Sequence, residues 1–235
     1  MNIETFIKEL KNLNINATNQ NLKDLEIYKD KLLEYNQKFN LTAIKQENEI
    51  YLKHFYDSLT LTKVIDLNQN LKIMDIGTGA GFPGLVLKIF YPNLDIVLVD
   101  SNHKKIEFLE NLAKTLKLTK IKCIVSRAED LPEEYREYFD IITSRAVSHL
   151  RILLELSFPY LKVNGHFLPM KGKLTEELEE SKSTLKVLDG QIEKEIDFNL
   201  PLEGSTRTIL DIKKTKPTKG LYPRRYDQIK KKVLK

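Results

Sequence analysis

The sequence is poor in residues that crosslink chains or bind metals, with one cysteine and four histidines among 235 residues. Its single thiol, Cys123, cannot form a disulfide within the chain, and the apolar run around it predicts a buried side chain. The histidines lack metal-ligand spacing, so we expect no metal site. No apolar run approaches the ~20 residues of a membrane span, and the N-terminus has a helical period rather than a secretion signal. We therefore expect a cytoplasmic protein that does not bind membranes.

Charge is distributed unevenly along the chain. Residues 213–235 contain ten Lys or Arg residues and one acid, whereas the whole chain has a net charge of +5, so the remainder is mildly acidic. A basic segment on an acidic body is typical of proteins that bind a polyanion such as nucleic acid. We name Arg224 and Arg225 as candidate contacts, although a solvated basic terminus has the same composition.

The order of apolar patterns predicts an α/β fold in one globular unit. Apolar residues recur at helical spacing through residues 1–65, which we interpret as a helical cap over 1–66. The core, 67–213, alternates helices with strands, and 214–235 is a basic tail. Alternation of this kind indicates a mostly parallel sheet with helices on both faces, closed by a late antiparallel hairpin. Helices are expected at 104–116, 150–161 and 174–188, and strands at 71–76, 95–99, 120–125, 139–144, 166–170, 192–200 and 207–212.

The strand ending at Ile76 runs into a loop with glycines at 77, 79, 81 and 84. Glycine at alternate positions permits positive φ and close approach of a ligand to the backbone, so Gly77 and Gly79 are predicted to bind one. Asp100 ends the next strand, where an acid can hold ribose hydroxyls. The glycine loop and Asp100 together predict a nucleoside-containing cofactor.

The residues around the loop narrow the choice of cofactor. The dinucleotide pattern requires glycine where this chain has Phe82, and the phosphate-binding loop of nucleotide hydrolases requires Lys and Ser or Thr where it has Leu85 and Val86. Ala128 and Glu129 follow the third strand, where they could contact an adenine. These positions suit the methionine, ribose and adenine of a cofactor without phosphates.

At this point the sequence resembles the class I S-adenosylmethionine-dependent methyltransferases. More closely, it resembles the bacterial small-subunit rRNA methyltransferase family called RsmG or GidB. The similar blocks occur in the order of that family: Asn40 to Ile44, His54 with Asp57 to Leu59, Asp75 to Gly84, Leu98 to Ser101, Arg127 to Glu129, Ser144 to Val147, and Tyr222 to Arg224.

The resemblance implies a Rossmann-like fold with a seven-stranded sheet and the transfer of a methyl group to N7 of a guanine. The guanine would lie in the decoding-centre loop of 16S rRNA, with naked rRNA or the small ribosomal subunit as the substrate and a monomer as the enzyme. The cofactor residues of the family map to Gly77, Phe82, Ala128, Glu129 and Arg145. The tail departs from the family, which often has a glycine where this chain reads Arg225-Tyr226-Asp227.

No catalytic side chain is predicted, because guanine N7 carries a lone pair and no proton. Lys171, after the fifth strand, is a candidate RNA contact. His54 is interpreted as a structural histidine bonded to Asp57 three residues on. The alternatives are methylation of another RNA nucleotide, an NAD-dependent oxidoreductase, which Phe82 disfavours, and a non-enzymatic RNA-binding protein, which would have lost the glycine loop.

Overall fold

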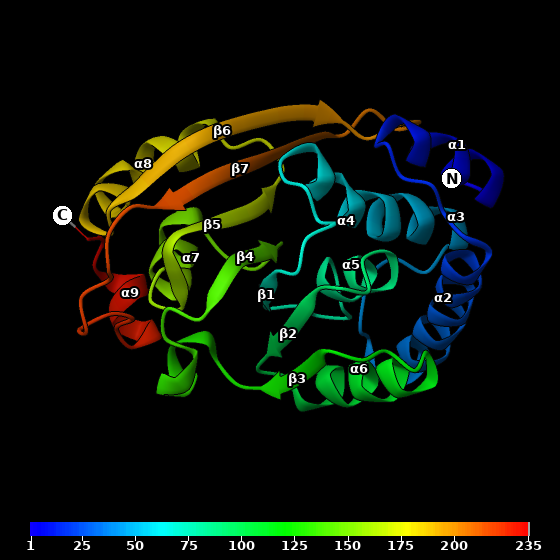
Figure 1. Cartoon of the computed structure of the whole chain (residues 1–235), viewed down its shortest axis with the longest axis horizontal. Helices are drawn as coiled ribbons and strands as arrows, with labels where there is room; N and C mark the ends of the chain where they lie inside the picture. The colour runs from blue at the N-terminus through cyan, green and yellow to red at the C-terminus, as the bar shows by residue number, and fades with distance from the viewer. Residues whose placement is uncertain (235) are drawn as a thin grey trace.

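The computed structural model describes residues 1–234 (Figure 1). Seven strands form one sheet: β1 Lys72–Ile76, β2 Asp95–Asp100, β3 Ile121–Val125, β4 Phe139–Arg145, β5 Leu161–Lys171, β6 Gly190–Asn199 and β7 Thr206–Lys214. The α-helices are α1 Ile3–Asn12, α2 Asn19–Phe39, α3 Glu47–Glu49, α4 Asp57–Leu59, α5 Gly84–Phe90, α6 His103–Thr115, α7 Leu150–Ser157, α8 Thr175–Val187 and α9 Tyr226–Lys231. A π-helix, η1 Ile50–Tyr56, and three 3₁₀ turns, η2 Thr60–Lys63, η3 Ala128–Asp130 and η4 Glu133–Tyr135, complete the elements.

The strands are ordered β3-β2-β1-β4-β5-β7-β6. The first five are parallel, and β7 is antiparallel to both β5 and β6. This confirms the predicted mostly parallel sheet with a late antiparallel hairpin. The chain order reverses between β1 and β4, and in open α/β sheets ligands bind at the carboxyl ends of the strands beside such a reversal.

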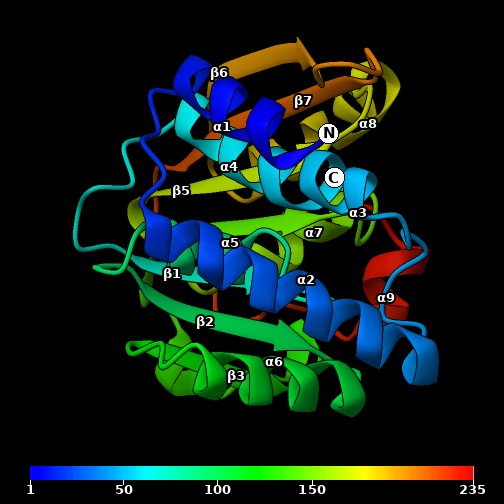
Figure 2. The same ribbon diagram turned by 90° about the vertical axis from the view of Figure 1, so that its right-hand side faces the viewer.

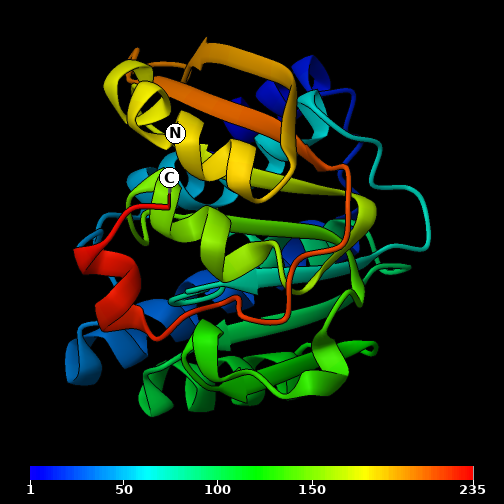
Figure 3. The same ribbon diagram turned by 90° about the vertical axis from the view of Figure 1, so that its left-hand side faces the viewer.

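Alternation along the strands divides the interior into two cores. Ile73 and Ile96 face a first core, whereas their neighbours Met74 and Val97 face a second. The first core is covered by α1, α2, α5 and α6, with α2 against α5 and α6 (Figure 2). The second is covered by α7, α8 and α9, where α7 touches both of the others (Figure 3). Successive side chains of a strand point to opposite faces of the sheet, so both faces are apolar here, and helices cover both of them.

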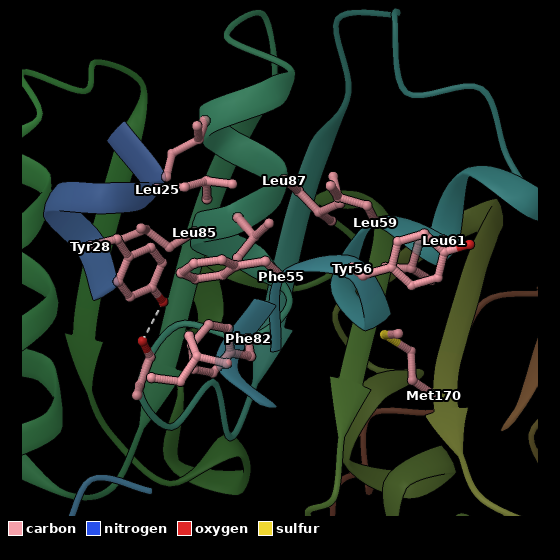
Figure 4. Packing of buried hydrophobic residues seen from close by; sticks show 14 of the residues in the cluster. Leu25, Tyr28, Phe55, Tyr56, Leu59, Leu61, Phe82, Leu85, Leu87 and Met170 are labelled. Carbon is pink, nitrogen blue, oxygen red and sulfur yellow. Dashed lines mark hydrogen bonds between the residues drawn. The ribbon is translucent and has the colours of Figure 1, made fainter. Parts of the chain in front are cut away.

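The N-terminal helices pack on the sheet rather than forming a separate core. Phe6 and Phe55 belong to the same hydrophobic cluster as the strand residues Ile73 and Ile96. Figure 4 shows Tyr28, from α2, directed at the glycine loop, where its hydroxyl donates a hydrogen bond to the carbonyl of Ala80. The boundaries at 66 and 213 remain predictions.

Three expectations and one alternative from the sequence need correction. β5 begins at Leu161 rather than His166, and α7 ends at Ser157 rather than 161, because Pro159 has no N–H to continue the helix. The basic tail is not a free terminus, since Tyr222 and Ile229 are buried in the second core. Cys123 is only half-buried.

Candidate cofactor and methyl-acceptor site

The glycine loop follows β1 at the reversal of strand order. Gly77, Gly79 and Gly81 all have positive φ, at 66°, 60° and 103°. At Gly77 a Cβ atom would lie 2.6 Å from Cγ2 of Val147, so a side chain would meet both backbone strain and a neighbour. The N–H of Gly79 donates to Oδ2 of Asp100 at 2.9 Å, which joins the loop to the end of β2.

Asp75 lies beneath the loop and is fully buried. Its Oδ2 accepts hydrogen bonds from Oγ1 of Thr78 at 2.7 Å and from the N–H of Gly84 at 2.9 Å. Its Oδ1 is buried without a hydrogen-bond donor from residues 1–234. Burial raises the pKa of Asp75 from 3.8 to about 7, although the two donors and the charge of Arg145 oppose that shift. The folded protein therefore retains a proton on this carboxyl group in weakly acidic solution.

Asp75→Asn is expected to flatten the pH profile of stability. In the wild type this group lowers the free energy of unfolding as pH rises from about 4 to about 7, because the unfolded chain releases a proton that the folded protein retains. Asparagine does not titrate, so the decline should be smaller in the variant. Urea denaturation at several pH values across this interval measures both profiles. If the free energy of unfolding of Asp75→Asn fell equally steeply with pH, the pH dependence would come from other titratable groups.

A cavity of about 390 Å³ opens at the carboxyl ends of β1, β2, β3 and β4, within the ~300–1,000 Å³ of typical small-molecule sites. Its lining residues come from these four strand ends, from α6 and α7, and from the C-terminal helix: Ile76, Gly77, Val99, Asp100, Ser101, Lys105, Ser126, Arg127, Ala128, Glu129, Ala146, Val147, Leu156 and Tyr226. We call it the cofactor cavity.

The residues of the cofactor cavity fit a nucleoside with an amino-acid chain. The absence of a side chain at Gly77 keeps open the space that Val147 borders, where backbone can approach a ligand. Both carboxylate oxygens of Asp100 are held by backbone N–H groups, from Gly79 and Asn102 at 2.9 Å each, so the acid has a fixed orientation beside the cavity. A fixed carboxylate can accept ribose hydroxyls, and Ala128 with Glu129 borders the cavity at the β3 end.

The structure brings five of the seven predicted cofactor residues to or beside this cavity. Gly77, Asp100, Ala128 and Glu129 line it, and Gly79 is bonded to Asp100.

Phe82 and Arg145 are placed elsewhere. The Phe82 ring is 5% exposed and is stacked between Tyr28 and His54, with centroid distances of 5.4 and 4.1 Å (Figure 4 shows the Tyr28 side). The Arg145 side chain is turned toward the N-terminal helices, where Asp57 attracts it. Their cofactor contacts remain predictions that this geometry does not favour.

A second cavity, of about 330 Å³, adjoins the first, and Ala146 lines both. Its other lining residues are Ile44, Lys53, His54, Asp57, Arg145, Met170, Lys171, Gly172 and Arg207. We call it the acceptor cavity. Four of the ten are Lys or Arg, which suits an anionic or electron-rich ligand.

The buried carboxylate of Asp57 binds two of the four cationic side chains of the acceptor cavity. Its Oδ2 accepts from NH1 of Arg145 at 2.8 Å, and its Oδ1 accepts from Nε of Arg207 at 3.2 Å. NH1 of Arg145 also donates to the carbonyl of Lys53 at 2.8 Å. Residues from the cap, from β4 and from β7 are thus held in one network.

His54 belongs to this network and not to the predicted bond with Asp57. Its Nδ1 lies 3.1 Å from NH2 of Arg145, and its Nε2 lies 2.9 Å from Oγ1 of Thr42. Because arginine only donates, Nδ1 accepts and Nε2 carries the proton of a neutral ring. Burial, followed by the charge of Arg145, lowers the pKa of His54 from 6.5 to about 3. At neutral pH the ring is uncharged.

The three predicted RNA contacts lie in different environments. Nζ of Lys171 is 2.6 Å from Oε1 of Glu177 and also donates to the carbonyl of Ser148. Arg224 is paired with the buried Glu155, whereas the Arg225 side chain is 86% exposed. Of the three, Arg225 is the most exposed, whereas Lys171 lines the acceptor cavity.

Neither a metal centre nor a membrane span emerges from residues 1–234. None of the helices there is long and apolar enough to cross a membrane. Within the same residues, no group of three His, Cys, Asp or Glu side chains could hold a metal ion.

The sheet, the glycine loop and the acid at the end of β2 define a Rossmann-like, S-adenosylmethionine-dependent methyltransferase. A family model described as rRNA small subunit methyltransferase G, GidB, matches residues 21–200. The chain belongs to this family, as its resemblance in sequence predicted.

Individual relatives agree with the family assignment. Proteins named ribosomal RNA small subunit methyltransferase G from Lachnoclostridium phytofermentans and Desulfitobacterium hafniense are 44% and 46% identical to this chain, covering 94% of it in each case. The alignments cover 92% and 93% of those proteins. The fold is similar to a crystal structure of a SAM-dependent methyltransferase from Aquifex aeolicus, with a TM-score of 0.56 and 17% identity over 74% of this chain and 96% of that one.

Several residues at the two cavities were missed by the sequence reasoning. Lys105, with Nζ 3.8 Å from Oδ2 of Asp100, lies in the first turn of α6, and a single charged residue at such a place forms no distinctive sequence pattern. Asp57 was noticed in a motif but assigned to His54. Arg207 and Tyr226 carried no signal, since only the folded chain brings them to these cavities.

Proposed function

We propose that this protein transfers the methyl group of S-adenosylmethionine to N7 of a guanine in the decoding-centre loop of 16S rRNA. The observation that best supports the proposal is that Ala146 lines both the cofactor cavity and the acceptor cavity, so the two are neighbours. A base entering the basic acceptor cavity would approach a methyl donor in the other. Relatives named for the small ribosomal subunit support rRNA as the substrate, either naked or assembled.

The cofactor residues would orient the donor. Asp100 would accept the ribose hydroxyls, Ala128 and Glu129 would border the adenine, and Gly77 would allow the amino-acid chain to approach the backbone. When bound, S-adenosylmethionine supplies an electrophilic methyl group. Fixed alignment of the donor with the base and exclusion of water would provide the rate enhancement, a proximity effect worth at most ~7–11 kcal/mol.

Arg145 would position the guanine. It uses three of its five N–H donors on Lys53, His54 and Asp57 within the described chain, so two remain for an acceptor such as guanine O6. N7 has an in-plane lone pair and loses no proton, so no general base is required. The neutral His54 agrees with this, because its role is to accept a bond from Arg145.

The residues do not suit methylation of cytosine at carbon 5. That reaction requires a thiolate nucleophile. Cys123 lies within β3, outside both cavities, and burial raises the pKa of its thiol to about 12. The family assignment likewise gives no support to the NAD-dependent alternative.

Methyl transfer to N7 is tested with isotope-labelled S-adenosylmethionine and with 30S subunits or 16S rRNA that lack the modification. We expect labelled 7-methylguanosine after digestion to nucleosides. Label in another nucleoside would support an RNA methyltransferase of different specificity. No label, with the donor bound and the protein folded, would contradict rRNA methylation altogether.

Arg145→Ala should impair methyl transfer without weakening the binding of the cofactor. We expect the rate of methyl transfer to fall by about 100-fold, as misplacement of a reactant can cost, while the Kd for S-adenosylmethionine changes by less than about threefold. Arg145→Lys keeps the charge but loses the planar fork, so it should restore little activity. A large loss of cofactor affinity in either variant would instead place Arg145 at the cofactor.

A further inference from the structure

One residue of the C-terminal helix α9 lines the cofactor cavity. All its lining residues lie between Ile76 and Leu156 except Tyr226, the first residue of α9. The ring is half-buried and packs against the second core. It was not predicted to contact the cofactor, because the C-terminal segment reads as a basic tail.

The backbone on both sides of Tyr226 is fixed to the body of the protein. Before it, Arg136 donates from NH1 to the carbonyl of Tyr222 at 3.0 Å and from NH2 to that of Lys219 at 3.1 Å. After it, NH1 of Arg151 donates to the carbonyl of Ile229 at 3.3 Å. The ring is therefore held at the cavity by contacts that do not depend on a ligand.

Tyr226 lies at the β3 end of the cavity. The Arg127 guanidinium is 5.9 Å from the centre of its ring, and NH1 of Arg127 is 3.7 Å from Oε1 of Glu129. Strand order places β2, which ends in Asp100, between β3 and β1. A nucleoside with its ribose at Asp100 and its amino-acid chain near Gly77 would direct its base toward β3, and thus toward Tyr226.

We propose that Tyr226 completes the cofactor site as the aromatic face on which the adenine stacks. The proposal depends on the cofactor position given under Proposed function. An aromatic ring suits this place because stacking on a base needs only a flat apolar surface, and the neighbouring Arg127 holds the ring through a cation–π contact. The C-terminal segment thereby forms part of the cofactor site rather than a separate RNA-binding tail.

The experiment is equilibrium dialysis of wild type, Tyr226→Ala and Tyr226→Phe against labelled S-adenosylmethionine and 5′-methylthioadenosine, which lacks the amino-acid chain. Tyr226→Ala should weaken both ligands by a similar factor of about ten, the usual cost of losing one stacked base. Tyr226→Phe should bind within about twofold of wild type. Gln228→Ala, exposed on the same helix, is the matched control and should bind as wild type does.

Several results would overturn the proposal. One is unchanged affinity of Tyr226→Ala for both ligands, and another is a loss confined to S-adenosylmethionine, which would place the ring at the methionine end. A Tyr226→Phe variant as weak as Tyr226→Ala would also contradict stacking. In each case the wild type still binds the donor, so the proposed function stands, whereas a wild type that binds neither ligand would contradict that function itself.

Discussion

Gly77→Asp is expected to abolish binding of S-adenosylmethionine. The new side chain would begin 2.6 Å from Cγ2 of Val147, in a backbone conformation with φ of 66°, and would extend into the cofactor cavity. Its carboxylate would also repel the carboxylate of the amino acid that we place there. We expect the Kd to rise by more than about 100-fold, as several kcal/mol of lost contact and added repulsion imply. Equilibrium dialysis measures it directly.

Gly220→Asp is the matched control, because it adds the same charge where a Cβ atom meets nothing within 4 Å. It should bind the donor as the wild type does. Circular dichroism and urea denaturation of both variants show whether Gly77→Asp remains folded. A folded Gly77→Asp protein that keeps its affinity would mean that the cofactor lies elsewhere.

Arg224→Ala should destabilise the whole protein by about 3 kcal/mol, at the lower end of the cost of breaking a buried ion pair. Glu155 is 1% exposed and accepts three bonds from Arg224, from its backbone N–H at 3.0 Å and from Nε and NH2 at 2.7 Å each. Removal of the guanidinium would leave a buried carboxylate without its countercharge. The free energy of unfolding in urea measures the effect.

Two controls separate this structural effect from a general effect of tail charge. Arg225→Ala removes an exposed side chain whose nearest acid, Asp227, is 3.8 Å away, so its stability should lie within about 0.5 kcal/mol of wild type. Adding Glu155→Gln to Arg224→Ala should recover part of the loss, because no charge is then left buried. Equal destabilisation by Arg224→Ala and Arg225→Ala would show that the ion pair of Arg224 with Glu155 contributes no more to stability than an exposed charge does.

Local patterns were sufficient to predict the sheet and the cofactor loop. The central strands β1 and β2 are short apolar runs with almost every residue buried, so their positions follow from hydrophobicity and period. The loop after β1 was recognisable because close backbone approach and positive φ both require glycine, and the structure has positive φ at Gly77, Gly79 and Gly81. Apolar runs and closely spaced glycines each involve only a few consecutive residues, so they can be recognised in the sequence alone.

The acceptor cavity could not be predicted in the same way. Asp57, Arg145 and Arg207 come from the cap, the fourth strand and the last strand, and they meet only after all three have packed. Charged residues are common on any surface, so nothing in their spacing distinguishes a buried ion pair from a solvated side chain. Arg224 illustrates the difficulty, since it reads as part of a basic tail and is paired with a carboxylate 69 residues earlier.

The α/β fold, the methyltransferase family and the conformation of the glycine loop were all evident from the residues in order along the chain, because hydrophobic period and glycine spacing encode local backbone geometry. Folding in three dimensions was needed to show which charges pair across the acceptor cavity, that His54 is neutral beside Arg145, and that Tyr226 borders the cofactor cavity. Those properties depend on burial and on distances between residues far apart in the chain. They arise only once the two cores have formed.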